Sequence, residues 1–159
     1  MTIHPLVAAG AGGDLDACAR LMSSTEPWLT LGRTYDAALA TLSDPAKEVH
    51  VARVDDELAG FIVLNMTGAF VGYIQTVCMA PPFRGRGLGS ELIRWAERRI
   101  FVRTPNVFMC VSSFNQSARR LYERLGYQVV GELTDYIVAG HSELLLRKTI
   151  GPLSEWRRP

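Results

Sequence analysis

Residues 84–90 of this 159-residue chain read RGRGLGS, so three glycines and two arginines stand where a helical pattern begins. A helix N-terminus leaves about four N–H groups without intrahelical partners, and the helix dipole adds roughly half a positive charge there. Together they attract an anion, typically a phosphate. Glycine lets a ligand oxygen approach the main chain, and Arg84 and Arg86 add forked donors that match phosphate. The segment predicts a site for a phosphate-bearing molecule that is held mainly by the main chain.

Two common phosphate-binding motifs do not fit this segment. A P-loop requires GxxxxGK[ST], and the segment contains no lysine. A Rossmann fingerprint requires a third glycine at the position of Ser90. A short glycine motif can also be a flexible helix entry with two solvated arginines, and the motif alone leaves that alternative open.

Apolar periodicity and turn residues predict the elements that position the segment. We expect strands over residues 3–9, 48–54, 58–66, 71–79 and 106–113, a long bent strand from 127–132 and 136–140, and a last strand over 141–148. We expect helices from an N-cap at Asp14 to about Ser24, and over 35–42, 87–102 and 115–125. This order favours a mixed sheet with helices on both faces. It predicts a single domain, 1–148, followed by a surface tail, 149–159.

Composition argues against several classes of protein. The formal net charge of +1 provides no field that would draw the chain onto nucleic acid or an anionic membrane. The three cysteines are widely spaced without a CxxC pair, and the three histidines have no metal-ligand spacing. No apolar run reaches the ~18 residues of a membrane span, and no signal-peptide pattern opens the chain. We expect a cytoplasmic protein that binds no metal, nucleic acid or membrane.

Two motifs together resemble one family. The strand VGYIQTVCM, then APPF, then Arg84-x-x-Gly87-x-Gly89 resembles the acetyl-CoA signature (Q/R)-x-x-G-x-(G/A) of the GNAT acetyltransferase superfamily. Farther along, SSFNQSARRLYERLGYQVVGE is similar to its second hallmark, in which an Asn opens a helix and an LYE-x-x-GF segment closes it. The resemblance is good over residues 45–148 and extends to the first 44 only in helix count. It implies the GNAT acyl-CoA N-acyltransferase fold of the α/β (α+β) class, with a mixed, mostly antiparallel sheet of about six to seven strands and splayed central strands.

The resemblance also implies how acetyl-CoA is held without a metal. Its pyrophosphate would lie on main-chain N–H groups of the glycine loop, and its pantetheine arm would run along the end of the preceding strand. The thioester would lie in the opening between the splayed strands. The cofactor-binding residues implied in this way are Val77, Cys78, Met79, Arg84, Gly85, Arg86, Gly87, Leu88, Gly89, Ser90 and Asn115.

Tyr122 has two interpretations. Helical spacing that predicts one buried face is shared by Ala118, Leu121, Tyr122 and Leu125. Asn115 suits the N-cap of this helix and Gly126 the position after its end. From the pattern alone, Tyr122 is a core aromatic residue. The resemblance implies instead that Tyr122 is catalytic and donates a proton to the departing CoA thiolate, and a phenol pKa near 10 keeps that proton in place at neutral pH.

The sequence does not identify a general base. Ribosomal-protein N-terminal alanine acetyltransferases carry a glutamate five residues before the Asn, where this chain has Cys110. Other relatives carry a glutamate on the strand before the loop, where this chain has Gln75, which cannot act as a base. A water relayed by Gln75 and the carboxylate of Glu26 remain open. A covalent acetyl-cysteine at Cys110 or Cys78 is less favoured, because buried strand cysteines are usually inert.

We therefore expect an acetyl-CoA-dependent N-acetyltransferase. The acceptor would be a primary amine of a small molecule or peptide that attacks directly in a ternary complex. The alternative is a non-catalytic acyl-CoA-binding or regulatory module, which the missing glutamate at Cys110 motivates. Trp28 and Glu26 would wall the acceptor site or, equally well, pack on the sheet and face solvent. The segment 135–141 is a second candidate wall, and a homodimer is among the options because members of this family often pair.

Overall fold

The computed structural model describes residues 1–6 and 12–157 of the chain. The strands are β1 (Thr2–Pro5), β2 (Glu48–Val54), β3 (Glu57–Asn65), β4 (Tyr73–Met79), β5 (Asn106–Ser112), β6 (Gln128–Leu133) and β7 (Glu143–Thr149). The helices are α1 (Gly12–Ser23), α2 (Tyr35–Leu42), α3 (Leu88–Phe101) and α4 (Gln116–Arg124), and a short 3₁₀ turn, η1 (Pro81–Phe83), comes before α3. The strands form one seven-stranded sheet in the order β1-β2-β3-β4-β5-β7-β6. Neighbouring strands are antiparallel except for β4 and β5.

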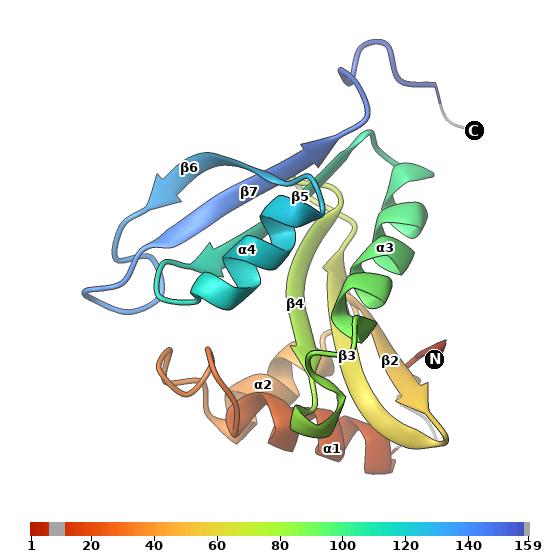
Figure 1. Ribbon diagram of the computed structural model, residues 1–159, viewed down its shortest axis with the longest axis vertical. Coiled ribbons are helices and arrows are strands. Elements are labelled where there is room, and N and C mark those ends of the chain that lie inside the picture. The colour runs from red at the N-terminus through yellow and green to blue at the C-terminus, as the bar shows by residue number, and fades with distance from the viewer. Residues whose placement is uncertain (7–11, 158–159) are drawn as a thin grey trace.

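The helices cover both faces of the sheet, as the sequence predicts (Figure 1). The face under α1 and α2 contains Phe61 and Val63, and the face under α3 and α4 contains Ile62 and Leu64. Successive side chains of a strand point to opposite faces. β3 therefore reads as a continuous apolar run, because it is buried on both sides.

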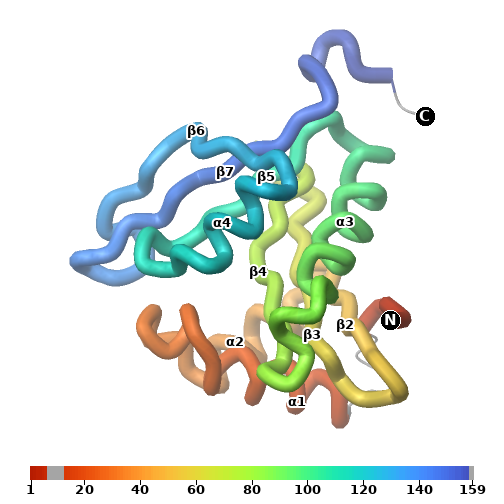
Figure 2. The backbone as a smooth tube through the Cα atoms, viewed as in Figure 1, coloured from red at the N-terminus to blue at the C-terminus, as the bar shows by residue number. Residues whose placement is uncertain are grey.

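The two central strands, β4 and β5, diverge along their length. Their pairing joins residues 73–74 with 108–109 and no others, although β4 continues to Met79 and β5 to Ser112. The backbone trace shows the two strands close together at one end and separating toward their C-terminal ends (Figure 2). The expectation of splayed central strands is confirmed.

A bulge in β4 lies where that strand leaves β5. Ile74 pairs with Leu64 and Thr76 pairs with Val63, so Gln75 has no partner in β3. A bulge bends a strand and shifts its side-chain alternation by one residue. Accordingly, Ile74 belongs to the core under α3, whereas Cys78, four residues later, belongs to the core under α1.

Two expectations about the N-terminal part need revision. Asp14 is not the N-cap of α1, because the helix already begins at Gly12. Its carboxylate instead forms an ion pair with Arg53, which holds the first turn of α1 against β2. The first strand ends at Pro5, and residues 7–9, which were expected to continue it, lie outside the described residues.

The expected long, bent strand is also wrong. β6 ends at Leu133, and residues 136–140 form turns and bends. Asp135 has a left-handed φ of +51°, and its carboxylate accepts a hydrogen bond from the Gly140 amide at 2.6 Å. This local ring closes the connection on itself. The last strand accordingly begins at Glu143, not at 141, and runs to Thr149.

Candidate functional site

The loop before α3 is an open helix N-terminus. Gly87 is its N-cap in the left-handed conformation (φ +81°), and Gly85 has φ +71°. Residues other than glycine are strained in this region. The first hydrogen bond of the helix runs from the Glu91 amide to the Gly87 carbonyl at 3.1 Å. The amides of residues 88–90 therefore have no acceptor within the helix, as an anion site requires.

The two arginines of the loop make different contacts. Arg84 donates from Nε to the Met79 carbonyl at 2.8 Å and so ties the loop to the end of β4. The Arg86 guanidinium lies over the Phe83 ring, 5.5 Å from its centroid. Both arginines are exposed. Their two positive charges therefore stay in solvent beside the open amides, where they add to the attraction for an anion.

The free edge of β4 forms the second part of the site. Because β4 leaves β5 after Ile74, its residues 75–79 face no strand on that edge. Val77 and Met79 pack toward α3, and Cys78 is buried on the opposite side. A Cβ at Gly89 would lie 3.5 Å from the Met79 side chain. The structure thus brings the strand end and the glycine loop together, as the sequence predicts.

Helix α4 is capped at both ends in the way the sequence predicts. The Asn115 side chain accepts a hydrogen bond from the Ala118 amide at 3.2 Å. Gly126 follows the helix with φ +92°, and the Tyr127 amide returns to the Tyr122 carbonyl at 3.0 Å, as in a Schellman motif. The predicted apolar face packs on the core, although none of its residues is fully buried.

Tyr122 lies on the same side of the sheet as the glycine loop. Its ring meets that of Tyr127 edge-on, with centroids 6.2 Å apart. It packs on the core cluster that also holds Val77 and Met79 at its margin. Burial raises the pKa of Tyr122 to about 12, so the phenol keeps its proton at neutral pH.

A polar group borders the splay on the other face of the sheet. Val111 and Leu144 point into the core under α3 and α4, so their strand neighbours Ser112 and Glu143 point the opposite way. Ser112 and Glu143 are paired in the β5–β7 ladder. The Glu143 side chain is nearly inaccessible, with 4% of the residue exposed. Burial raises the pKa of Glu143, and a hydrogen bond with Ser112 acts in the opposite direction.

Tyr73 and Cys110 lie in the same polar group. Burial raises the pKa of Tyr73 far above its usual value, and Cys110, Tyr136 and Glu143 add to that shift. Burial also raises the pKa of the Cys110 thiol, to which the Glu143 charge contributes while Tyr73 opposes it. Because both pKa values are raised, Tyr73 and Cys110 are neutral at neutral pH.

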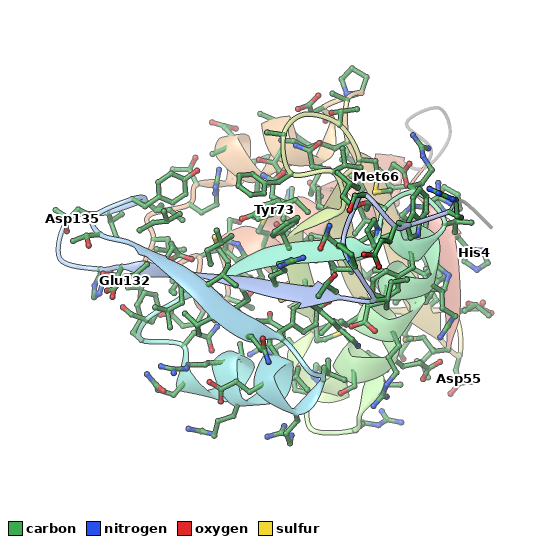
Figure 3. All side chains as sticks on the ribbon, turned by 90° about the horizontal axis from the view of Figure 1, so that it is seen from above. His4, Asp55, Met66, Tyr73, Glu132 and Asp135 are labelled. Carbon is green, nitrogen blue, oxygen red and sulfur yellow. The ribbon has the colours of Figure 1, made fainter. Side chains whose placement is uncertain are left out.

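In the view of Figure 3, Tyr73 lies near the middle of the molecule, and Asp135 lies at the far tip of the β6–β7 connection.

Glu143 and Tyr73 were missed in the sequence. Glu143 precedes the apolar run LLL and resembles a solvated residue at the start of an edge strand. In the structure β7 lies between β5 and β6, so it is an interior strand. The burial of Glu143 depends on the strands to either side of it, so no local pattern in the sequence indicates it.

The residues proposed as an acceptor wall behave as ordinary packing. Trp28 packs at the margin of the core under α1 and α2. Glu26 is exposed, and its carboxylate accepts a hydrogen bond from the Thr30 amide at 3.2 Å. Trp28 thus packs on the sheet and Glu26 faces solvent, the arrangement given above as the alternative to an acceptor wall. Gln75, the other residue considered for proton transfer, is the bulge residue of β4.

Other features of the described chain lie away from this site. A cavity of about 410 Å³ between α3 and the ends of β2 and β3 is lined by Glu48, Met66, Trp95, Arg98, Arg99, Val102 and Arg103. Within residues 1–6 and 12–157, no three His, Cys, Asp or Glu side chains group in a way that would hold a metal ion. No helix of this part is both long and apolar enough to cross a bilayer.

Known proteins share this sequence pattern and fold. A sequence model of the Acetyltransferase (GNAT) family matches residues 15–127. An aminoalkylphosphonate N-acetyltransferase of Salmonella typhimurium is 33% identical over 101 residues, which are 58% of this chain and 64% of that protein. The N-alpha-acetyltransferase RimI of Mycobacterium tuberculosis is 28% identical over 155 residues, 95% of this chain and 94% of that protein. An aminoglycoside 6'-N-acetyltransferase crystallised with coenzyme A has a TM-score of 0.74 at 18% identity, covers 96% of this chain and 98% of its own, and shows likeness of fold alone.

Proposed function

The chain belongs to the GNAT acetyltransferase family, and from that premise we propose that it transfers the acetyl group of acetyl-CoA to a primary amine of a small molecule or peptide. The observation that carries this proposal is the free edge of β4 beside the open N-terminus of α3. An acyl-CoA requires both features, because its diphosphate is anionic and its pantetheine arm carries amides that can pair with a strand edge.

Within this proposal the glycine loop and β4 hold the cosubstrate. The amides of residues 85–90, with Arg84 and Arg86 beside them, receive the diphosphate. The edge of Val77, Cys78 and Met79 pairs with the pantetheine amides, and an amide of that edge polarises the thioester carbonyl. Asn115, at the start of α4, borders the same space from the other side of the splay.

Tyr122 is the proposed acid. As the amine nitrogen bonds to the acetyl carbon, the C–S bond breaks and the sulfur receives the Tyr122 proton. A phenol with a pKa of about 12 would protonate a solvated thiolate poorly. Desolvation of the CoA thiolate within the site would raise the pKa of its thiol as well, because burial disfavours the charged form, and so favours transfer of the proton to sulfur.

Direct attack is favoured over an acetyl-cysteine intermediate. Burial raises the pKa of both Cys18 and Cys78 to about 12, and it also raises that of Cys110. A cysteine attacks as the thiolate, which these environments suppress at neutral pH. The ternary complex is thus the chemically simpler route.

A second candidate function is an acyl-CoA-binding module without turnover. It is motivated by Cys110, which stands where ribosomal-protein N-terminal alanine acetyltransferases carry a glutamate. The two functions agree on cosubstrate binding and differ only in CoA release.

One experiment separates the two candidates. The protein is incubated with acetyl-CoA and amino acids, spermidine, an aminoglycoside, an aminoalkylphosphonate or a peptide with a free N-terminus, and free thiol is measured. We expect amine-dependent CoA release with at least one acceptor. Calorimetry is run alongside. Tight binding of acetyl-CoA without release across the panel would favour the binding module, and absence of binding would contradict both.

We also propose that the chain pairs as a homodimer in the cytoplasm. β6 is an edge strand whose Val129 and Val130 are 42% and 52% exposed, and such an edge is prone to pairing. The three cysteines are unpaired, which fits a reducing compartment. Sedimentation should show a dimer that Val130→Asp disrupts, and a monomer at all concentrations would contradict the pairing.

A further inference from the structure

We propose that Glu143 is the general base of the transfer and that the acceptor is therefore an amine bound as its ammonium cation. The Glu143 carboxylate takes one proton from the ammonium, and the neutral nitrogen then attacks the acetyl carbon. As the C–S bond breaks, the sulfur takes the Tyr122 proton, the nitrogen loses its second proton, which restores Tyr122 through solvent, and Glu143 releases its proton to solvent. This inference rests on the proposed acetyl transfer and adds the proton acceptor that the sequence leaves open.

The Glu143 side chain is buried, and one of its oxygens is left without a partner in the described part of the chain. The residue is 4% exposed, and its Oε1 has no hydrogen-bond partner among the residues that the structure describes. A buried carboxylate oxygen without a partner is costly, so such groups are rare unless a ligand or function accounts for them. An ammonium group is the partner that a carboxylate oxygen accepts best.

Glu143 and Tyr122 lie on opposite sides of the sheet. Tyr122 packs on the core under α3 and α4, whereas Glu143 points to the opposite face. Between these faces, β4 and β5 have no pairing beyond Ile74 and Met109, and in the proposed function the thioester lies there. If the thioester lies between the two strands, its sulfur can face Tyr122 on one side of the sheet, and its carbonyl carbon can face Glu143 on the other. Acyl transfer proceeds through a tetrahedral intermediate, in which the amine approaches one face of the planar carbonyl, so the base must lie near that face and the acid within reach of the sulfur.

Polar side chains of β4, β5 and the β6–β7 connection lie near the Glu143 carboxylate. β5 presents Ser112 and Cys110, β4 presents Tyr73, and the β6–β7 connection presents Tyr136. Ser112 stabilises the charged form by a hydrogen bond, while burial favours the neutral form and prevails. The charge of Glu143 acts on both Tyr73 and Cys110, which places it beside the strands that border the splay. A raised pKa makes a carboxylate a stronger base, closer to what proton transfer from an ammonium requires.

The other candidates lack one of these features. Gln75 is an amide, and Glu26 is exposed and bound to the Thr30 amide at 3.2 Å. Cys110 holds its proton because burial raises its pKa. The ring of His141 stacks edge-on against Phe114, with centroids 4.9 Å apart, before β7 begins.

The test compares Glu143→Gln with Glu132→Gln in the full chain. Glu132 is an exposed carboxylate on the adjacent strand, paired with Leu144 and therefore on the opposite face. With any amine of the panel that the unmodified protein acetylates, we expect Glu143→Gln to lower kcat/KM by about 10²-fold or more. Glu132→Gln should retain the original rate, and both variants should bind acetyl-CoA as the unmodified protein does.

The pH profile distinguishes a base from a structural group. The unmodified protein should lose activity as the pH falls through the raised pKa of Glu143, because the carboxyl group then carries a proton. In Glu143→Gln that limb should disappear, and the rate should rise with pH up to the pKa of the amine, since only the neutral amine reacts. A variant that is merely misfolded would lose activity at every pH.

A second readout needs no acceptor. Cys110 is half-buried while Cys18 and Cys78 are buried, so iodoacetamide should label Cys110 first. The Glu143 charge raises the pKa of Cys110. Glu143→Gln should therefore shift the pH profile of labelling to lower pH, and Glu132→Gln should leave it unchanged.

Each outcome decides the proposal. Turnover that survives Glu143→Gln overturns the base while the acetyl transfer stands. An unmodified protein that releases no CoA with any amine overturns the transfer and the base role together. If the pH profile of Cys110 labelling is the same in Glu143→Gln as in the unmodified protein, the carboxylate does not lie beside the splay. Loss of turnover, loss of the acidic limb and a shifted labelling profile together support the proposal.

Discussion

Two neighbouring tyrosines, Tyr122 in α4 and Tyr127 just after it, allow the acid to be tested against a close control. The rings of Tyr122 and Tyr127 meet edge-on. Tyr127 differs in that its hydroxyl lies beside Glu97; burial raises the pKa of Tyr127 most, and Glu97 raises it further. We expect Tyr122→Phe to lower kcat by about 10²-fold while acetyl-CoA binds as before, because only the proton is lost. Tyr127→Phe should retain full activity. CoA release under saturating acetyl-CoA measures both, and normal turnover in Tyr122→Phe would remove the acid assignment.

The glycine loop makes a second prediction at the scale of single residues. Gly87 and Gly68 have nearly the same left-handed backbone, with φ of +81° and +78°, and a Cβ at either meets nothing within 4 Å. Valine at either position should cost about 1–2 kcal/mol of stability through backbone strain. Only Gly87→Val should weaken acetyl-CoA binding, by at least about 10-fold, because its side chain would lie between the main-chain amides and the diphosphate. Calorimetry decides, and equal affinity in both variants would contradict the diphosphate site.

At this scale the sequence predicts some residues and not others. Gly85, Gly87 and Asn115 could be predicted because their backbone geometry is local and depends on a few neighbours along the chain. Glu143 could not, because its burial depends on β6 and β5 lying on either side of it. That arrangement is a long-range property which no local pattern contains.

Among the elements, α2 and α4 offer a matched pair of N-caps. Thr34 accepts a hydrogen bond from Ala37, and Asn115 accepts one from Ala118, both at 3.2 Å. Replacing either cap by alanine should lower stability by about 1 kcal/mol. Only Asn115→Ala should also weaken acetyl-CoA binding, because α4 borders the splay and α2 does not. Urea unfolding and calorimetry test this, and an unchanged affinity would leave Asn115 with a purely structural role.

Most elements were predicted near their observed bounds because their apolar periodicity is strong. The exception is the segment 136–140, where YIVA carries strand-forming residues but the chain turns. The left-handed Asp135 and its bond to the Gly140 amide override the β propensity of Tyr136, Ile137 and Val138. Similarly, the divergence of β4 and β5 was expected only from the family resemblance, since each strand alone has an ordinary buried pattern.

For the whole molecule, the tail provides a test of the domain boundary. Beyond β7 it is fastened by the Ile150 amide, which donates to the Pro105 carbonyl at 3.0 Å. A small cavity of about 280 Å³ in the tail is lined by residues 150–152 and 155–157 alone. A chain that stops after Gly151 should keep its acetyl-CoA affinity and lose no more than about 0.5 kcal/mol of stability, as exposed segments do. Unfolding of the truncated chain would show that the domain extends to the tail.

The short pairing between β4 and β5 should affect how fast the protein is degraded in a cell. Strands β1–β4 and strands β5–β7 form two halves of the sheet that share only two paired positions. A cosubstrate that fills the gap would brace the halves, by mass action in proportion to its concentration. Proteases attack transiently opened chains, so degradation should slow when acetyl-CoA is plentiful and quicken when metabolism runs short of it.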